Sequence, residues 1–158
     1  MILRGPLGVG KTTIARRLAR SLDASYISVD RVLDRHDLIE FERNSITLGS
    51  FLAANRVIAS RYLDRSRRRR WVVVDGNFYW MGQIRDLRRR VRAPSRVFTL
   101  EAPVEVCIER DRRRARSYGV VATRRVFELT NRVHVGEAID ATAPPSRIVR
   151  TILARLAD

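Results

Sequence analysis

The chain has 158 residues, of which 45% are hydrophobic, and its formal net charge is +15 at pH 7. This length predicts a single domain over residues 1–158 and is too short for a second core. No apolar run reaches the length of a membrane span, which excludes a membrane partner of that kind. Cys107 is the only cysteine, so no internal disulfide can form, and we expect a reducing, cytoplasmic location.

A phosphate-binding motif follows the first predicted strand, residues 1–4. Residues 5–12 read Gly-Pro-Leu-Gly-Val-Gly-Lys-Thr and match G-x-x-x-x-G-K-[ST] without a mismatch. Lys11 is the only lysine beside 31 arginines, which indicates that this position needs a compact ammonium rather than a planar guanidinium. Apolar residues at helical spacing then predict a helix that begins at the motif: Ile14, Ala15, Leu18, Ala19 and Leu22. The expected nucleotide contacts are Gly5, Pro6, Leu7, Gly8, Val9, Gly10, Lys11, Thr12 and Thr13.

The next elements alternate between strand and helix patterns. A candidate second strand covers residues 25–29 and ends at Asp30, and a short helix over 31–39 follows it. Residues 41–50 are predicted to be a polar connection. The next helix is predicted from residues that share one face: Phe51, Ala54, Ile58 and Tyr62.

A buried strand over residues 71–75 has a carboxylate, Asp75, at its carboxyl end. Its run of valines is typical of a parallel sheet that is covered on both faces. A helix follows and stops before Pro94, and its apolar positions are Met81, Ile84, Leu87 and Val91. Residues 96–101 are the next predicted strand, and Pro103 suits the first position of another helix.

The last third of the chain continues the alternation. One helix face is formed by Val126, Leu129, Thr130 and Val133, a short strand covers 137–141, and a final helix begins at Ser146. The pattern predicts an α/β fold of the P-loop NTPase type, a three-layer sandwich around a doubly wound five-stranded parallel sheet. Ligands of such sheets bind at the carboxyl ends of the strands, where we place Lys11, Asp30 and Asp75.

Arginine runs account for much of the positive charge. They cover residues 65–70, 88–90 and 110–116. No interleaved aromatic residues accompany them, so the stacking signature of single-strand binding is missing. Arginine-rich solvated faces explain the runs more simply than a nucleic-acid partner does, although the charge favours an anionic ligand.

Several segments together resemble P-loop kinases of small acceptors, the group related to nucleoside monophosphate kinases that includes shikimate kinase, gluconate kinase, chloramphenicol phosphotransferase and polynucleotide kinases. Residues 5–12 carry the strongest match, and residues 72–78 are similar to the third-strand segment of adenylate kinases. Asn77 and Phe78 replace the Phe-Pro of that segment, and its following acceptor-binding arginine is missing, which argues against a standard adenylate kinase. Residues 28–30 and 109–114 resemble the acceptor aspartate and the lid entry of this group.

The resemblance implies roles for individual residues in ATP- and Mg²⁺-dependent phosphoryl transfer. Lys11 would bridge the β- and γ-phosphates, and Thr12 and Asp75 would hold Mg²⁺. Asp30 would orient or deprotonate an acceptor hydroxyl. The resemblance also implies a short arginine-rich lid over 112–120, with Arg110 and Arg114 as its two acting arginines.

Some alternatives remain at this stage. Asp30 precedes a predicted helix and could instead be its N-cap, and the aromatic residues at 78–80 could stack on an acceptor ring or pack in the core. The favoured function is a kinase that phosphorylates a hydroxyl of a small or nucleoside-like acceptor. The other candidates are a nucleoside monophosphate kinase, a 5′-hydroxyl polynucleotide kinase and a nucleotide-binding switch, and the oligomeric state is left open.

Overall fold

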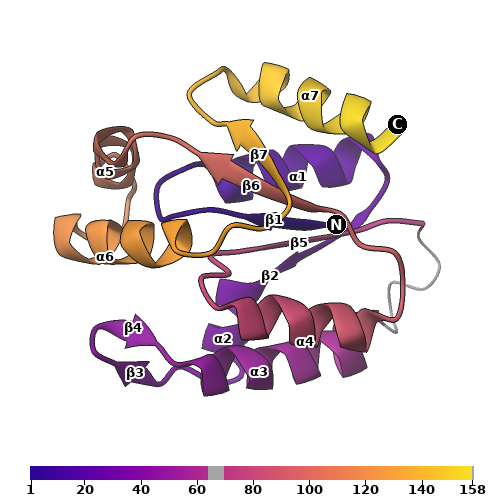
Figure 1. Cartoon of the computed structure of the whole chain (residues 1–158), viewed down its shortest axis with the longest axis horizontal. Coiled ribbons are helices and arrows are strands. Elements are labelled where there is room, and N and C mark those ends of the chain that lie inside the picture. Colours follow the sequence, from indigo (N-terminus) through magenta and orange to yellow (C-terminus); the bar gives the residue numbers. More distant parts are fainter. Residues whose placement is uncertain (64–69, 158) are drawn as a thin grey trace.

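A five-stranded parallel sheet forms the centre of the computed structural model, which describes residues 1–63 and 70–157 (Figure 1). The strand order is β2-β5-β1-β6-β7, and every neighbouring pair is parallel. The strands are β1 (Ile2–Arg4), β2 (Ser25–Ser28), β5 (Val72–Gly76), β6 (Val97–Glu101) and β7 (Glu137–Asp140). The predicted sheet is therefore confirmed, while most of the first arginine run, residues 65–69, lies outside the described residues.

Helices cover both faces of the sheet and complete the predicted three-layer sandwich (Figure 1). One face carries α1 (Lys11–Ser21) and α7 (Pro145–Ala157), and the other carries α2 (Val29–Arg35), α3 (Leu48–Val57) and α4 (Met81–Val91). At the carboxyl end of the strands, α5 (Val104–Arg112) and α6 (Val120–Asn131) pack against each other. No helix in the described ranges is both long enough and apolar enough to cross a membrane.

The sheet separates two hydrophobic cores because successive strand residues point to opposite faces. Ile2 and Val74 belong to the core beneath α2, α3 and α4, whereas Leu3 and Val73 belong to the core beneath α1 and α7. All four side chains are almost completely buried. This two-sided burial explains why the central strands read as continuous apolar runs rather than as alternating ones.

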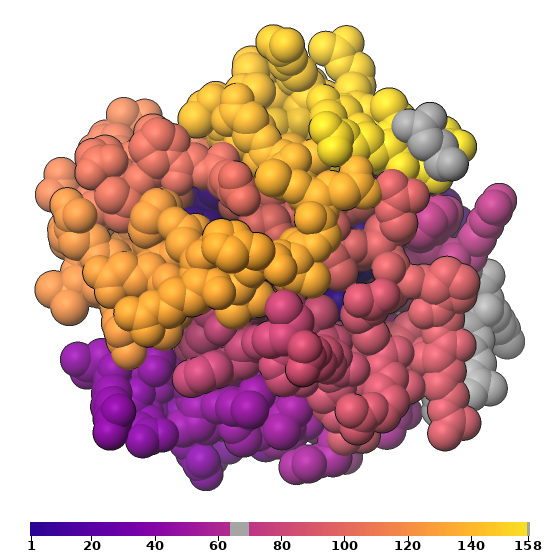
Figure 2. All heavy atoms as spheres, viewed as in Figure 1, coloured from indigo at the N-terminus to yellow at the C-terminus, as the bar shows by residue number. Residues whose placement is uncertain are grey.

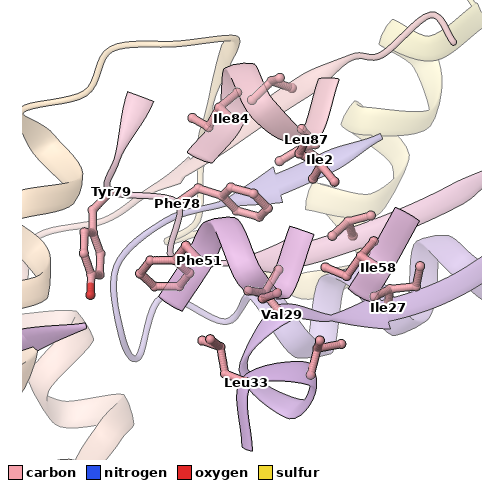
Figure 3. Packing of buried hydrophobic residues seen from close by; sticks show 14 of the residues in the cluster. Ile2, Ile27, Val29, Leu33, Phe51, Ile58, Phe78, Tyr79, Ile84 and Leu87 are labelled. Atoms are coloured by element: carbon pink, nitrogen blue, oxygen red, sulfur yellow. The ribbon is translucent and has the colours of Figure 1, made fainter. Parts of the chain in front are cut away.

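The core beneath α2, α3 and α4 contains Phe78, the second residue after β5 (Figure 3). Phe78 has a φ of 48°, an unfavourable value for a bulky residue, and its ring is fully buried. Figure 3 shows this ring directed into the cluster that Phe51, Ile84 and Leu87 help to form. Burial of the ring offsets the backbone strain at this position.

The connection predicted at 41–50 has more structure than its polar sequence suggested. β3 (Phe41–Glu42) and β4 (Ser45–Ile46) form an antiparallel hairpin, and α3 begins before the connection was expected to end. The two turn residues, Arg43 and Asn44, have φ values of 48° and 60°. Two consecutive residues in this left-handed region make the tight turn that a two-residue hairpin needs. α3 is followed directly by a π-helical segment, η1 (Ile58–Leu63).

Candidate functional site

The phosphate-binding loop joins β1 to α1 and depends on two glycines. Gly8 has a φ of 76°, and a Cβ there would lie 2.0 Å from the carbonyl oxygen of Cys107 on α5. Gly10 has a φ of 106° and is the N-cap of α1, where no side chain caps the helix. The backbone N–H groups at the start of α1 are therefore available to an anion, which is what a phosphate site requires.

Lys11 is a buried cation that lacks a counter-ion. Its Nζ donates a hydrogen bond to the carbonyl oxygen of Pro6 at 2.6 Å, and it forms no ion pair with the described residues. Burial lowers the pKa of Lys11 to about 8, although the negative charges of Asp30 and Asp75 oppose this shift. A phosphate would supply the charge that the ammonium lacks, so Lys11 fits the predicted nucleotide site.

Asp75 lies beside Thr12 at the carboxyl end of β5. The Thr12 hydroxyl donates to Oδ2 of Asp75 at 3.0 Å, and the Tyr26 hydroxyl donates to Oδ1 at 3.1 Å. Mg²⁺ is usually held by one or two protein oxygens together with water and substrate phosphates. The pair of oxygens from Thr12 and Asp75 fits that pattern, and in the described part of the chain no group of three or more metal-ligating His, Cys, Asp or Glu side chains occurs. Sequence analysis did not identify Tyr26, which fixes the second carboxylate oxygen.

Asp30 is not the N-cap of α2. The helix begins at Val29, and the hydroxyl of Ser28 accepts the capping hydrogen bond from the backbone N–H of Arg31 at 3.5 Å. The carboxylate of Asp30 forms no hydrogen bond or ion pair within the described ranges. Burial raises its pKa, with Lys11 opposing and Asp75 adding to the shift. Asp30 is therefore a free carboxylate in the first turn of a helix, and the predicted N-cap alternative is wrong.

Lys11, Thr12 and Asp30 line the same small cavity of about 180 Å³. A second cavity of about 330 Å³ continues along the loop past Gly10 and Thr13 to α7. The structure thus brings the predicted nucleotide residues and the predicted base to one edge of the sheet.

The two arginines predicted for the lid have different surroundings. Arg110 donates to the backbone carbonyl of Val9 at 3.1 Å and to that of Ala141 at 2.9 Å, which ties the phosphate-binding loop to the end of β7. Arg114 lies 3.6 Å from a carboxylate oxygen of Asp111 and over the ring of Tyr118, 5.7 Å from its centroid. Arg114 lines both cavities, and its charge acts on Lys11 and on Asp30. Arg114 therefore lies on the cavity that contains Lys11 and Asp30, whereas Arg110 holds the phosphate-binding loop through Val9.

Asp111 organises the connection between α5 and α6, residues 113–119, which lies within the lid predicted at 112–120. Its buried Oδ2 accepts hydrogen bonds from the hydroxyl of Ser117 at 2.6 Å and from the backbone N–H groups of Tyr118 at 2.9 Å and Gly119 at 3.1 Å. A carboxylate with three donors is a strong local anchor. Sequence analysis overlooked Asp111 because it lies within a run of arginines, and only the spacing to Ser117 and Gly119 could have indicated its role.

Arg4 is a third residue near the site that sequence analysis missed. Its fully buried guanidinium donates to the carbonyl oxygens of Phe78 at 3.3 Å, Thr130 at 2.7 Å and Val133 at 2.7 Å, and to the hydroxyl of Thr99 at 3.1 Å. Burial lowers the pKa of Arg4 to about 10. The side chain links the strand before the phosphate-binding loop to the segment after β5 and to the end of α6. The sequence did contain one signal for this role, because Arg4 is a charged residue in an otherwise apolar strand.

A further cavity, of about 720 Å³, lies apart from Lys11 and Asp30. Its lining includes Arg4, Thr99, Asn131 and His134, but neither Lys11 nor Asp30. The donors of Arg4 that face this region already bind backbone and hydroxyl oxygens. We therefore assign the functional site to the smaller cavities, where the unpaired charges lie.

The aromatic segment after Asn77 packs rather than lining the site. The Tyr79 hydroxyl accepts from the backbone N–H of Ile46 at 2.9 Å and donates to its carbonyl oxygen at 3.2 Å. Trp80 donates from Nε1 to the same carbonyl oxygen at 3.1 Å. With Phe78 in the core, all three residues fix the chain around the site, which answers the alternative left open by the sequence.

Comparisons with known proteins agree with this architecture. The chain is similar to a gluconokinase from Sinorhizobium meliloti, with 21% identity, coverage of 99% of this chain and 90% of the other, and a TM-score of 0.73. It is similar to shikimate kinase from Aquifex aeolicus, with 18% identity, coverage of 99% and 94%, and a TM-score of 0.67. It is also similar to the tunicamycin resistance protein of Deinococcus radiodurans, with 21% identity, coverage of 98% and 94%, and a TM-score of 0.66.

No curated protein matches the chain. A family model described as AAA domain matches residues 1–135, which include the phosphate-binding loop, Asp30, Asp75 and the lid. The fold of the chain is the one seen in the kinases above, as its sequence resemblance indicated. The chain belongs to the AAA domain family.

Proposed function

We propose that this protein is a kinase that transfers the γ-phosphoryl group of ATP to a hydroxyl group of a small-molecule acceptor. The observation that carries the proposal is one cavity lined by a buried lysine and by a carboxylate, neither of which forms an ion pair within residues 1–63 and 70–157. The lysine fits a phosphate because its buried charge needs a negative group nearby. The carboxylate lines the same cavity, where it could bind a hydroxyl beside that phosphate. Similarity to gluconokinase and shikimate kinase supports transfer to a hydroxyl.

The nucleotide is held by the loop and the start of α1. Backbone N–H groups from Gly8 to Thr12 surround the β-phosphate, and Lys11 moves from Pro6 to the β- and γ-phosphates. The 330 Å³ cavity beside Thr13 and Ala143 takes the rest of the nucleotide. Thr12 and Asp75 hold Mg²⁺, which when bound supplies positive charge against the phosphate oxygens.

Asp30 receives the acceptor. Its carboxylate accepts a hydrogen bond from the acceptor hydroxyl and orients the oxygen toward the γ-phosphorus. The acceptor oxygen forms a bond to that phosphorus as the bond from the phosphorus to the β–γ bridging oxygen breaks. The hydroxyl proton passes to Asp30, and ADP leaves. The raised pKa of Asp30 makes its carboxylate a better base than an exposed aspartate.

The lid completes the site from the opposite side. Arg114 faces both the nucleotide cavity and Asp30, so its guanidinium lies where the transferred phosphoryl group carries negative charge. Arg110 keeps the loop in place through Val9. Closure of residues 113–119 excludes water, which limits transfer of the phosphoryl group to water.

The first test is transfer of label from γ-labelled ATP, with Mg²⁺, to a panel of nucleosides, nucleoside monophosphates, 5′-hydroxyl oligonucleotides and sugar-like alcohols. Label on a hydroxyl is expected, and Lys11→Ala should reduce transfer about 10³-fold or more because the transition-state charge loses its buried partner. Arg17→Ala, on the exposed side of α1, is the matched control and should behave as wild type. Absence of ATP binding by the wild-type protein would contradict the proposal.

A nucleoside monophosphate kinase is a second candidate, and Arg125 on α6 is the observation that favours it. Arg125 is half-buried, and its charge acts on Tyr79, whose pKa burial raises to about 12. It forms no ion pair within the described residues, so it could receive an acceptor phosphate. Such an acceptor needs no general base. Full turnover of Asp30→Asn with a nucleoside monophosphate would therefore establish this candidate and exclude transfer to a hydroxyl.

A further inference from the structure

Exposed large apolar side chains gather at the catalytic edge. Across residues 1–63 and 70–157 there are four of them, Ile39, Phe41, Tyr118 and Val121, with exposed fractions of 40%, 72%, 56% and 77%. Ile39 and Phe41 belong to the hairpin segment, and Tyr118 and Val121 belong to the lid and the start of α6. Figure 1 shows α6 and the hairpin one below the other at the carboxyl end of the sheet. Exposed apolar groups that are confined to one edge indicate a contact surface.

The hairpin holds Phe41 in a fixed position. Phe41 pairs with Ile46 across the hairpin, and Ile46 is bound through its backbone N–H and carbonyl groups by Tyr79 and Trp80. Two buried or half-buried aromatic side chains thus anchor the strand that carries an exposed one. Because Phe41 is exposed and belongs to neither hydrophobic core, this anchoring holds an apolar ring at the surface without serving the packing of the fold.

The lid presents a second ring opposite the hairpin. The backbone N–H of Tyr118 is bound by Asp111, and the guanidinium of Arg114 lies over its ring. Tyr118 lines the cavity that contains Lys11 and Asp30. Burial raises the pKa of Tyr118, and the negative charge of Asp30 adds to this shift. In Figure 2 the hairpin borders α6, the helix that follows the lid, on the face that is shown.

The size of the inner cavity limits what it can enclose. Its volume is about 180 Å³, whereas pockets that bury a typical small ligand measure roughly 300–1,000 Å³. An acceptor whose hydroxyl reaches Asp30 therefore extends outward between the hairpin and the lid. Phe41 and Tyr118 would meet that outer part. A polyol would leave these rings in water, whereas a ring-bearing alcohol would cover them.

We propose that the acceptor is an alcohol that carries an apolar or aromatic ring, and that this ring lies between Phe41 of the hairpin and Tyr118 of the lid. This inference rests on the proposed kinase function, because it assigns the outer part of the same acceptor site. The arginine over Tyr118 adds to the preference for a flat ring, since a guanidinium and a phenol together form a polarised stacking surface.

The test compares matched alcohols with and without a ring, in the presence of Mg²⁺ and ADP: 1-phenyl-1,2-ethanediol against glycerol, and uridine against ribose. Binding is followed by saturation-transfer NMR and titration. We expect each ring-bearing member to bind about tenfold tighter than its partner, because burying one ring contributes on the order of 1.5 kcal/mol or more. Phe41→Ser should reduce this preference about fivefold or more, and Phe41→Leu should retain part of it.

Arg150→Ser, on the exposed face of α7, is the control variant. Equal binding of both members of each pair, or a preference that survives Phe41→Ser, would overturn the inference. The inference would also fail if sedimentation showed a dimer that Phe41→Ser dissociates, because a second copy would then cover the rings. If label is transferred to ribose or glycerol at a rate that Phe41→Ser does not change, the proposed kinase function stands and the proposed ring site is wrong. Ring binding that depends on Phe41, with no transfer of label to any alcohol, would support the ring site and reject the kinase.

Discussion

The nucleotide half and the acceptor half of the site are built in opposite ways. The proposed nucleotide half consists mainly of one continuous segment, residues 5–13, whose backbone and single lysine would provide most of the contacts. The proposed acceptor half draws on the first turn of α2, the hairpin and the lid. The first half is therefore recognisable as a motif, whereas the second exists only after the chain has folded.

The two carboxylates show the same contrast. Asp75, on the nucleotide side, already accepts hydrogen bonds from Thr12 and Tyr26. Asp30, on the acceptor side, has no such partner, and burial raises its pKa. A carboxylate that is held by two donors is suited to a fixed role such as holding a metal ion. A free one is suited to exchange a proton with a ligand. The predictions below test this division, beginning with the largest effect.

Replacing each carboxylate by an amide of the same shape should distinguish the role of Asp30 from that of Asp75. Asp30→Asn removes the proton acceptor without changing its shape, so kcat should fall about 10²–10⁴-fold while KM for ATP changes little. Asp75→Asn should instead raise the Mg²⁺ concentration needed for half-maximal rate. Steady-state kinetics with varied ATP and Mg²⁺ measure both effects. Asp34→Asn, on the exposed side of α2, is the control, and wild-type turnover in Asp30→Asn would remove the base from the mechanism.

Arg4 connects the two halves, and its loss should destabilise both. Arg4→Met would leave the carbonyl oxygens of Phe78, Thr130 and Val133 without their donor. Unsatisfied buried acceptors of this kind should lower the free energy of unfolding by about 2–4 kcal/mol. Urea denaturation measures the change, with the m-value held constant.

A matched control is available for this measurement. Arg150→Met changes an exposed arginine on α7 and should alter the unfolding free energy by less than about 0.5 kcal/mol. Arg4→Lys should fall between the two, because an ammonium cannot reach all of the oxygens that a guanidinium fork reaches. Equal effects of Arg4→Met and Arg150→Met would show that the linkage does not stabilise the fold.

Much of the fold could be predicted from the chain because its signals are local. Valine runs and helical apolar spacing predicted the strands and helices, and their alternation predicted the parallel order. The hairpin escaped prediction because its turn uses Arg43 and Asn44, both at positive φ, without the glycine that normally marks such a turn. The start of α2 was misplaced by two residues because Ser28, not Asp30, caps it.

The missed site residues share one physical property: each acts through contacts between segments distant in sequence. Arg4 binds carbonyl groups near the other end of the chain, and Tyr26 reaches Asp75 from a neighbouring strand. Asp111 binds a turn whose path only the folded lid defines. Motifs identify residues that act with their neighbours in sequence, so they located the phosphate-binding loop but could not locate these partners.

The last prediction concerns pH and the nucleotide half alone. Burial lowers the pKa of Lys11 from 10.5 to about 8. Above this pH the free protein holds a neutral amine, whereas bound ATP favours the ammonium. Binding therefore takes up a proton, and the apparent Kd for ATP should rise by up to about tenfold per pH unit between pH 8 and 10.5.

The same shift has an opposite consequence for the free protein. Between pH 8 and 10.5 the unfolded chain carries the Lys11 proton and the folded chain does not, so Lys11 makes the folded state more stable as pH rises through this window. Titration calorimetry of ATP binding near pH 9, in two buffers of different ionisation enthalpy, measures the proton uptake directly. A Kd that stays constant across the window, with no proton taken up, would mean that the ammonium of Lys11 is already charged before ATP arrives. The partner of Lys11 would then be a group of the protein rather than the phosphate. The nucleotide half would no longer contain an unpaired cation, and its contrast with the unpaired carboxylate of the acceptor half would be lost.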